Sequence, residues 1–369
     1  MKKVVRNLVI YLNILVAVFL LISYTAPYVN PAKILFPAFF GLSYPYLLII
    51  NLLFLIYWTI RFRKPVVISL VAILIGWSHL MNFMPLRFNT DKVESEDKIS
   101  NNETLKVMSY NVRTFDQFKW SENKNSRDNI FQLIRNQSPD IVCLQEFYTR
   151  NKAGSSEKDI HVLMGNYDHH VIYYSKKTSE NSGIGIATYS RYPIIKTSRI
   201  PFNETRNQAV YVDIKYGNDT IRVFNIHLQS IKLAHNNYSF MDTLSLKYSN
   251  KQMKEVKDIG IKLRDAFVQR SEQSIIIHRY IEASPYPVIV TGDFNDTPIS
   301  FAYNTIKKDL MDAFRETGKG LGNTYAGDLP SFRIDFILYS KKLQSVEFNR
   351  IKVKNSDHFP IIAKLKNNN

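Results

Sequence analysis

Cysteine is nearly absent from this chain of 369 residues, which contains Cys143 and no other. A single cysteine can form neither an internal disulfide nor a zinc cluster. Because Cys143 lies in the apolar run DIVCL (140–144), we interpret it as a small buried hydrophobic residue rather than as a nucleophile. Internal repeats and a glycine-rich phosphate loop are also missing from the sequence.

Acidic residues are missing from positions 1–85, which contain seven lysines and arginines. This part of the chain instead holds three long apolar segments, at about 8–24, 34–60 and 66–83. A membrane-spanning helix needs ~20 mostly apolar residues, so we predict three transmembrane helices that together form an anchor. A signal peptide is the alternative for the first segment, and a buried soluble helical bundle is the alternative for all three.

The basic residues of the anchor predict its orientation, because loops rich in lysine and arginine stay in the cytoplasm. Lys2, Lys3 and Arg6 precede the first segment, and Arg61, Arg63 and Lys64 lie between the second and the third. The loop between the first and second segments carries only Lys33. With three spans, everything after residue 85 lies outside the cytoplasm, on a bacterial-type inner (plasma) membrane. The loss of one span would reverse that placement.

The remainder of the chain carries 41 lysines and arginines against 32 aspartates and glutamates, a net charge of +9 out of the total +16. This balance suits a phosphate-bearing partner or an anionic membrane surface, and a generally basic surface explains it equally well. The polar stretch 86–104 is predicted to be a linker.

From residue 105 onward, short apolar runs alternate with stretches of helical periodicity. Helices are predicted at 126–138 and 247–283, and strands at 105–112, 140–147, 169–175, 183–190, 209–216, 220–228, 288–290, 333–340 and 359–366. Many strands in hairpin-like succession, with few helices, predict an α+β fold built on two sheets.

Polar side chains recur at the ends of these predicted strands. The stretch VTGDFNDTP (290–298) places Asp293 and Asn295 two residues apart after a β-branched run, where both side chains point to the same side. The other members of the set are Asn111 in SYN, Glu146 in LQE, His227 after VFNI, Asp335 in RID, and Asp357 with His358 in SDH. Each alone is a weak signal, but the shared position predicts one site at the rim of a sheet.

In this order, the motifs resemble those of the endonuclease/exonuclease/phosphatase superfamily, which includes deoxyribonuclease I, abasic-site endonucleases, neutral sphingomyelinases and inositol polyphosphate 5-phosphatases. The resemblance covers about residues 105–366, and 105–369 is the predicted catalytic domain. It implies a four-layered α/β sandwich and divalent-metal-dependent hydrolysis of a phosphoester. The membrane helices are an addition to that core.

The resemblance also implies roles for the residues. Glu146 is the expected metal ligand, Asn111 would assist through its amide oxygen or through a water, and Asp357 would be a further ligand, with Mg²⁺ as the metal and Mn²⁺ as the alternative. Asp335 would polarise His358. Either His358 takes the proton from water, or Asp293 does while His358 holds a phosphate oxygen; Asn295 would orient the water or the phosphate, and His227 would stabilise the transition state or protonate the leaving group.

The expected substrate is a phosphoester, in nucleic acid or in a lipid head group, and no protein partner is predicted. The alternative function is a non-catalytic module of the same fold that binds phosphate or lipid. Tyr325 is expected either in the wall of the substrate pocket or in the core, and Arg113 is interpreted as solvated or structural rather than as a phosphate ligand.

Overall fold

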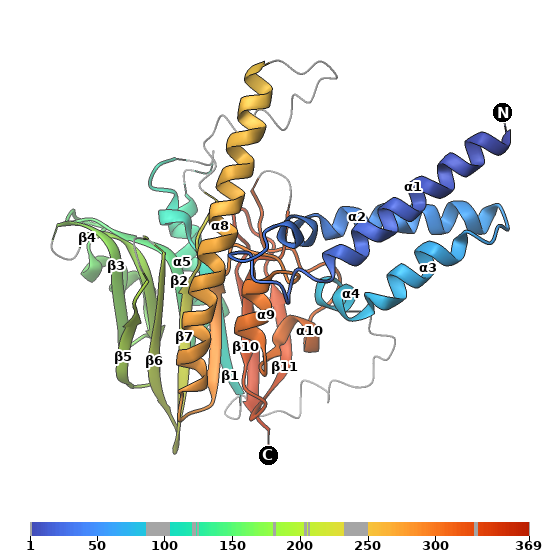
Figure 1. The fold of residues 1–369 in the computed structure, drawn as a ribbon. Coiled ribbons are helices and arrows are strands. Elements are labelled where there is room, and N and C mark those ends of the chain that lie inside the picture. The colour runs from blue at the N-terminus through green and yellow to red at the C-terminus, as the bar shows by residue number, and fades with distance from the viewer. Residues whose placement is uncertain are drawn as a thin grey trace. The chain divides into compact units, whose positions relative to one another are not determined.

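The computed structural model describes residues 2–85, 104–119, 123, 125–179, 182–202, 205, 207–231, 250–327 and 331–368 (Figure 1). The predicted linker at 86–104 therefore lies outside the described residues, apart from its last position. The described chain begins with four helices, and two β-sheets flanked by further helices follow.

The N-terminal part contains α1 (Lys2–Ser23), α2 (Phe36–Ile60), α3 (Val66–Ile75) and α4 (Trp77–Phe83). Helices α1 and α2 are long and apolar enough to cross a membrane, as predicted. The prediction of one continuous third helix is wrong, because α3 and α4 meet at an angle of 69°. The described chain thus has two candidate spans, or three if the bent pair forms one span, and the placement of the following chain outside the cytoplasm stays a prediction.

The bend lies at Gly76, which ends α3 and precedes α4. A Cβ atom at this position would come within 2.1 Å of the ring of Tyr24, so a larger residue would collide with Tyr24, which directly follows α1. Sequence periodicity cannot reveal this break, because Tyr24 is distant in the chain.

Four buried polar side chains connect the first three helices. Asn13 of α1 donates a hydrogen bond to Ser69 of α3 (2.7 Å) and accepts one from Trp58 of α2 (3.0 Å). Ser69 in turn donates to Asn51 of α2 (3.1 Å), whose amide nitrogen donates to the Leu47 carbonyl (2.9 Å). Polar residues that bond across helices hold membrane bundles together, so these contacts fix α3 against its neighbours.

The second part is built on two six-stranded sheets. Sheet A has the strand order β11-β12-β1-β2-β4-β3, and sheet B has the order β5-β6-β7-β8-β10-β9. The strands of sheet A are β1 (Thr104–Asn111), β2 (Ile141–Thr149), β3 (His169–Ser179), β4 (Ser182–Ser190), β11 (Leu343–Arg350) and β12 (Ile361–Asn367). Those of sheet B are β5 (Ile194–Ile200), β6 (Gln208–Tyr216), β7 (Asp219–His227), β8 (Val288–Asp293), β9 (Met311–Asp312) and β10 (Asp335–Tyr339).

Alternation along the strands produces the layers. Val107 and Cys143 face the core between the two sheets, whereas Met108 and Val142 face a second core. Helices α5 (Ser126–Gln137) and α6 (Glu157–Met164) cover this second core. On the other side, Tyr280 of α8 (Asn250–Glu282) contacts Tyr211 of β6. The predicted α+β fold class and four-layered sandwich are therefore confirmed, and Cys143 is buried as expected.

Most predicted elements are present with shifted ends, and several elements were not predicted. Strand β5 is largely exposed and strand β11 only partly buried, so neither shows a clear apolar pattern. The short elements η3 (Arg113–Asp116), α9 (Phe301–Lys307), α10 (Ala313–Thr317) and β9 were missed as well. None of these lies in a long periodic segment, which is the pattern that sequence reasoning detects best.

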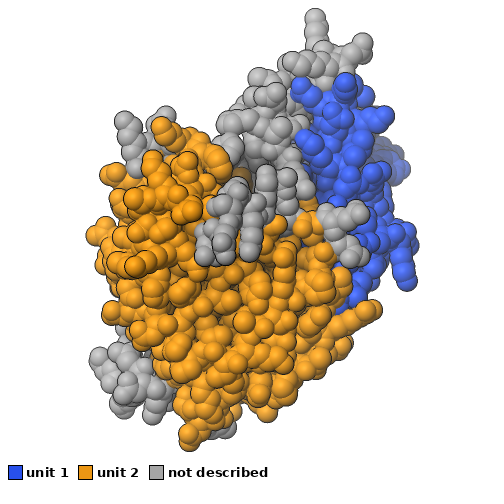
Figure 2. All heavy atoms as spheres, turned by 90° about the vertical axis from the view of Figure 1, so that its left-hand side faces the viewer, with its two compact units in different colours: residues 1–84, 231–275, 296–305 blue, residues 85–230, 276–295, 306–369 orange. Residues whose placement is uncertain are grey.

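The chain divides into two compact units (Figure 2). The first, which we call the membrane unit, comprises residues 1–84, 231–275 and 296–305. The second, which we call the sandwich unit, comprises residues 85–230, 276–295 and 306–369. The membrane unit thus includes two segments that lie far beyond the N-terminal helices in the sequence.

Candidate active site

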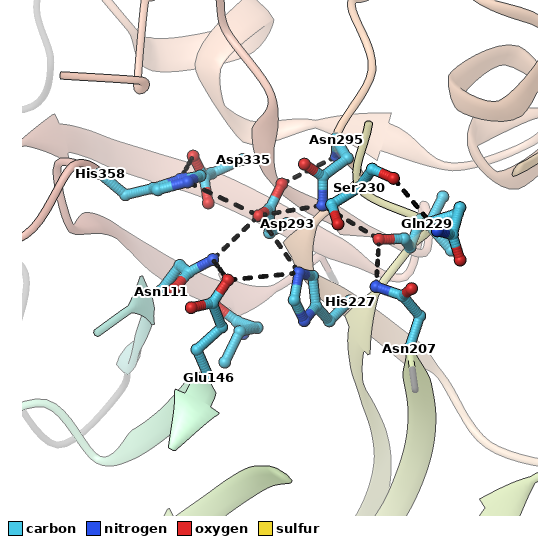
Figure 3. Close-up of polar contacts among 12 residues, drawn as sticks. Asn111, Glu146, Asn207, His227, Gln229, Ser230, Asp293, Asn295, Asp335 and His358 are labelled. Atoms are coloured by element: carbon cyan, nitrogen blue, oxygen red, sulfur yellow. Dashed lines mark hydrogen bonds and ion pairs between the residues drawn. The ribbon is translucent and has the colours of Figure 1, made fainter. Parts of the chain in front are cut away.

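Seven of the eight predicted polar residues meet at one rim of the sandwich unit (Figure 3). In sheet B, His227 at the end of β7 and Asp335 at the start of β10 both lie in register with Asp293 at the end of β8. In sheet A, Asn111 ends β1 and lies in register with Gln145 of β2. Glu146 directly follows Gln145. Parallel strands end at the same edge, and this brings residues distant in sequence together.

Gly292, directly before Asp293, allows β8 to approach β7 closely. A Cβ atom at this position would lie 1.9 Å from the Ile226 carbonyl oxygen, and the φ angle is +139°. Only glycine adopts this conformation readily. The glycine of the motif therefore sets the position of the carboxylate that follows it.

Asp293 lies at the centre of the site and its side chain is 1% exposed. Its Oδ2 accepts a hydrogen bond from Asn111 Nδ2 (3.0 Å) and lies 3.7 Å from both His227 Nε2 and His358 Nε2. Burial raises the pKa of Asp293; the positive charge of His358 opposes this shift and the negative charge of Asp335 adds to it. The site thus holds a carboxylate with a greater tendency to bind a proton than an exposed aspartate has.

His358 and Asp335 form the predicted pair. Nδ1 of His358 lies 2.9 Å from Oδ2 of Asp335, and both side chains are buried. Burial alone would lower the pKa of His358, but the charges of Asp335 and Asp293 and the hydrogen bond to Asp335 raise it well above the ordinary value of 6.5. Tyr325 pairs with His358 through a β-bridge, with the ring centroids 5.5 Å apart, so it lies against the site rather than in a distant core.

Glu146 reaches the site from a strained position. Its φ angle is +49°, in the left-handed region, and the register between β2 and β4 shifts between Leu144 and Phe147. Such backbone strain is concentrated at functional sites. The Glu146 carboxylate is one-third exposed, and its Oε1 lies 3.9 Å from His227 Nε2 and 3.5 Å from Asn111 Nδ2.

Asn111 presents its amide nitrogen, not its oxygen, to the carboxylates. Its Oδ1 accepts a hydrogen bond from the backbone N–H of Arg113 (3.0 Å). This acceptor contact assigns the two amide atoms. In this arrangement Asn111 orients Glu146 and Asp293, whereas the sequence predicted a metal ligand acting through the amide oxygen or through a water.

Asn295 leaves the strand in the left-handed region, with φ at +52°. Its backbone N–H donates to Asp293 Oδ1 (2.8 Å), and its side-chain amide donates to the Leu228 carbonyl (3.0 Å) and to Asp293 Oδ2 (3.3 Å). Asn295 therefore fixes Asp293 and connects it to the loop that follows His227.

Asp357 pairs with Arg113 and Ser356 rather than with the carboxylates of the site. Its Oδ2 lies 3.2 Å from Nε of Arg113, and its Oδ1 accepts a hydrogen bond from Ser356 Oγ (3.2 Å). The structure gives it no contact with Glu146 or Asp293 among the described residues. The expectation that Arg113 is structural agrees with this pairing, and the role of Asp357 as a further metal ligand has no support from the geometry.

Two polar atoms of the site are buried and have no hydrogen-bond partner within the described ranges. They are Nε2 of His227 and Oδ1 of Asp335. Buried polar groups are nearly always paired, and a bound ion, water or substrate can supply a missing partner. These two atoms can therefore accept or donate further hydrogen bonds.

The acidic residues can hold a divalent cation. Asp293, Asp335 and His358 offer ligand atoms within 4.8 Å of one another. However, a metal-bound imidazole must be neutral, and His358 has a raised pKa and is occupied by Asp335. Glu146 is the more exposed carboxylate and stands beside Asp293, which suits the hard oxygen ligands that Mg²⁺ prefers.

Supporting residues were not identified from the sequence. Thr324 Oγ1 accepts hydrogen bonds from the backbone N–H of Ile334 and of Asp335 (3.0 Å each), and Ser356 Oγ donates to the Asn111 carbonyl (2.8 Å). Asn207 donates to the Leu228 carbonyl (2.7 Å), the same oxygen that Asn295 contacts. Ser356 stands within the SDH motif, whereas the other two occupy loops with no pattern that indicates their partners.

Comparisons with known proteins agree with this geometry. Residues 108–358 match the model of the Endonuclease/Exonuclease/phosphatase family, and residues 6–83 match a model described as a domain of unknown function. A search of the curated proteins finds no match.

Solved structures share the fold at low sequence identity. An endonuclease/exonuclease/phosphatase from Bacteroides vulgatus is 18% identical with a TM-score of 0.54, covering 72% of this chain and 99% of the other. A humanized D. rerio TDP2 with 14 mutations is 17% identical with a TM-score of 0.50, covering 72% of this chain and 99% of the other. A mannosyl-6-phosphatase from Bacteroides thetaiotaomicron is also 17% identical with a TM-score of 0.50, covering 71% of this chain and 99% of the other. The chain belongs to the endonuclease/exonuclease/phosphatase family.

Proposed function

We propose that this chain is a membrane-anchored, divalent-metal-dependent phosphoester hydrolase, and more specifically a phosphodiesterase. One observation carries the proposal: Oδ2 of Asp293 lies within 3.7 Å of polar nitrogens from Asn111, His227 and His358, on three separate segments. Such convergence of a buried carboxylate with two imidazoles supplies the proton donors and acceptors that hydrolysis of a phosphoester requires.

Glu146 would hold the cation, with Asp293 beside it, and Mg²⁺ fits these oxygen donors better than a soft metal does. Mn²⁺ is the alternative. The bound cation would neutralise charge on the phosphate oxygens. Asn111 would keep both carboxylates in place through its amide nitrogen, and so acts by orientation rather than by ligation.

The geometry favours one of the two assignments for the general base. Nδ1 of His358 is committed to Asp335, and the charges of Asp335 and Asp293 raise the pKa of the imidazole, which favours its protonated form. We therefore assign the proton acceptor for the attacking water to Asp293 and the contact with a phosphate oxygen to His358 Nε2. His227, whose Nε2 lacks a hydrogen-bond partner among the described residues, would protonate the leaving oxygen or stabilise the charge that develops there.

The substrate would carry its phosphoester either in nucleic acid or in a lipid head group. The two apolar N-terminal helices support a function close to a membrane. A bacterial inner membrane with the sandwich unit outside the cytoplasm is the proposed location, and it follows from the distribution of basic residues and from counting the bent pair α3–α4 as one span.

The test uses the full chain in detergent, with bis-p-nitrophenyl phosphate, p-nitrophenyl phosphate, single- and double-stranded DNA, and phospholipid vesicles as substrates. We expect hydrolysis with Mg²⁺ that EDTA abolishes. Glu146→Gln and His358→Ala should remove it, whereas His170→Ala should not, because His170 contacts Glu157 outside the site (3.7 Å).

Full activity in a folded Glu146→Gln or His358→Ala protein would refute the assignment of the site. A folded wild-type chain that binds Mg²⁺ and vesicles but hydrolyses no member of the panel would instead favour the alternative, a non-catalytic module that binds phosphate or lipid.

A further inference from the structure

The chain passes directly from the active site into the membrane unit. Asn295 is the last residue of its segment in the sandwich unit, and Asp296 begins the segment 296–305 of the membrane unit. A single peptide bond therefore joins an active-site residue to the unit that contains α1 to α4. Three separate contacts fix the segment within that unit.

The first contact is a buried ion pair. Nε of Arg270, in α8, lies 3.2 Å from Oδ2 of Asp296, and the two side chains are 1% and 6% exposed. Taking charges out of water is costly unless they are paired, so each residue holds the other in place. Asp296 Oδ1 also accepts a hydrogen bond from the backbone N–H of Thr297 (3.0 Å), which fixes the turn beyond it.

The second contact places the segment against α2. Ile299 is 1% exposed and belongs to the apolar cluster of the first three helices. A Cβ atom on Gly41 would lie 2.7 Å from the Ile299 carbonyl oxygen and 2.6 Å from Cβ of Ala26. The helix thus approaches the backbone of the segment so closely that only glycine fits.

The third contact lies farther along. The side-chain amide of Asn304 donates a hydrogen bond to the Pro27 carbonyl in the loop between α1 and α2 (3.0 Å). Residues 296, 299 and 304 are thereby held by three different parts of the membrane unit. A simple anchor does not require these contacts, because the chain between α4 and β1 already joins the two parts covalently.

On the other side of the peptide bond, Asn295 has little freedom. It adopts a left-handed φ of +52° and hydrogen-bonds Asp293 with both its backbone and its side chain. A displacement of Asp296 would be transmitted to these bonds. Misplacement of a reacting group by about 1 Å can reduce turnover about 100-fold.

We propose that the membrane unit positions the active site, and that Gly41, Arg270, Asp296 and Ile299 are positioning residues for Asp293 and Asn295. The inference rests on the proposed function. The membrane helices are then part of the catalytic architecture as well as an anchor, and the site works fully only when the segment 296–305 is seated in the membrane unit.

The test measures turnover of bis-p-nitrophenyl phosphate by the full chain in detergent micelles with saturating Mg²⁺. A soluble substrate removes any effect of access to a membrane. We expect Gly41→Ala to lower kcat about 10- to 100-fold with little change in KM. Alanine is the better helix former, so the substitution does not weaken α2 itself.

Gly260→Ala in α8 is the matched control, because a Cβ atom there meets nothing within 4 Å. It should leave kcat within about twofold of the wild type, as expected for a change that touches nothing.

The ion pair provides a second test with its own control. Asp296→Asn should lower kcat about 10-fold or more, and Asp296→Glu, which keeps the charge, should restore part of the loss. Asp213→Asn breaks another buried pair, in which Asp213 lies 2.6 Å from Arg222 within sheet B, and it should leave the kcat of the folded fraction unchanged. If Asp296→Asn does not fold, Gly41→Ala still decides the question.

Wild-type kcat in folded Gly41→Ala and Asp296→Asn proteins would overturn the inference, and so would an equal loss in the two controls. Both results leave the proposed function intact, since the wild type would still hydrolyse the substrate. A folded wild-type chain without metal-dependent hydrolysis would refute the proposed function and this inference with it.

Discussion

The bundle of N-terminal helices and the candidate active site each contain a buried group of polar side chains, but the two groups differ in how their hydrogen bonds are completed. In the bundle, Asn13, Asn51, Trp58 and Ser69 hydrogen-bond one another and two backbone carbonyls. In the site, Nε2 of His227 and Oδ1 of Asp335 are buried with no hydrogen-bond partner within the part of the chain that the structure describes.

This difference separates a structural network from a functional one. In a network whose side chains all pair with one another, the hydrogen bonds serve the association of the helices. A site that keeps polar atoms unpaired bears a cost in stability, and a bound cation and phosphate can relieve it. Each of the following predictions tests one side of this contrast.

The largest effect is expected at the centre of the site. Asp293→Asn should lower kcat by about 10²- to 10⁴-fold, because it removes the assigned proton acceptor. Its stability at pH 7 should be equal to or above that of the wild type, since the raised pKa shows that burial disfavours the charged carboxylate. Steady-state kinetics and thermal unfolding check the two parts, and a wild-type kcat would contradict the assignment.

His358 differs from His227, because the Nδ1 atom of His358 is paired with Asp335. A pKa raised on folding stabilises the protein fully below the unfolded value of about 6.5, and this contribution is lost as the pH rises through the folded pKa. His358→Gln should therefore cost about 3 kcal/mol of unfolding free energy below pH 6.5 and progressively less above it. Unfolding in EDTA across the pH range measures this, and a cost that grows with pH would contradict it.

Metal should stabilise the site that lacks internal partners. At a Mg²⁺ concentration 100 times its Kd, the gain in unfolding free energy is about 2.7 kcal/mol. Glu146→Gln should abolish most of this gain, whereas Asp357→Asn should keep it, because the structure pairs Asp357 with Arg113 instead. Unfolding with Mg²⁺ and with EDTA checks both variants, and loss of the gain in Asp357→Asn would restore that residue as a ligand.

The smallest effect is expected in the bundle. Asn13→Ala removes the partner of both Ser69 and Trp58 and should cost about 0.6 to 1.7 kcal/mol, the average and the maximum for hydrogen bonds between membrane helices. The kcat of the folded fraction should stay at the wild-type value. Unfolding in detergent, followed by kinetics on the folded protein, measures both quantities; a loss of turnover without a loss of stability would contradict the structural role.

The convergence of these polar residues could be predicted from the sequence, because their positions follow from strand ends. His227, Asp293 and Asp335 meet because neighbouring strands of sheet B bring them into register. The pairing of Asp357 with Arg113 could not be predicted, since it depends on the path of the chain beyond the end of β1. The left-handed φ of Glu146 likewise has no sequence signal.

The fold also has features that could be predicted from the sequence and features that could not. The sandwich followed from alternation, whereas the exposed edge strand β5 lacks that pattern. Gly76, at the break, lies against the ring of Tyr24, and residues 296–305 of the membrane unit lie against residues such as Gly41. Contacts between distant parts of the chain decided these features, and composition and periodicity do not record them.

The most direct test compares Asp293→Asn with Asn13→Ala in the full chain, measuring kcat with Mg²⁺ and the unfolding free energy for both. We expect opposite outcomes: Asp293→Asn loses turnover and keeps stability, whereas Asn13→Ala loses stability and keeps turnover. Wild-type turnover in folded Asp293→Asn would contradict the claim that the rim of the sandwich is the active site.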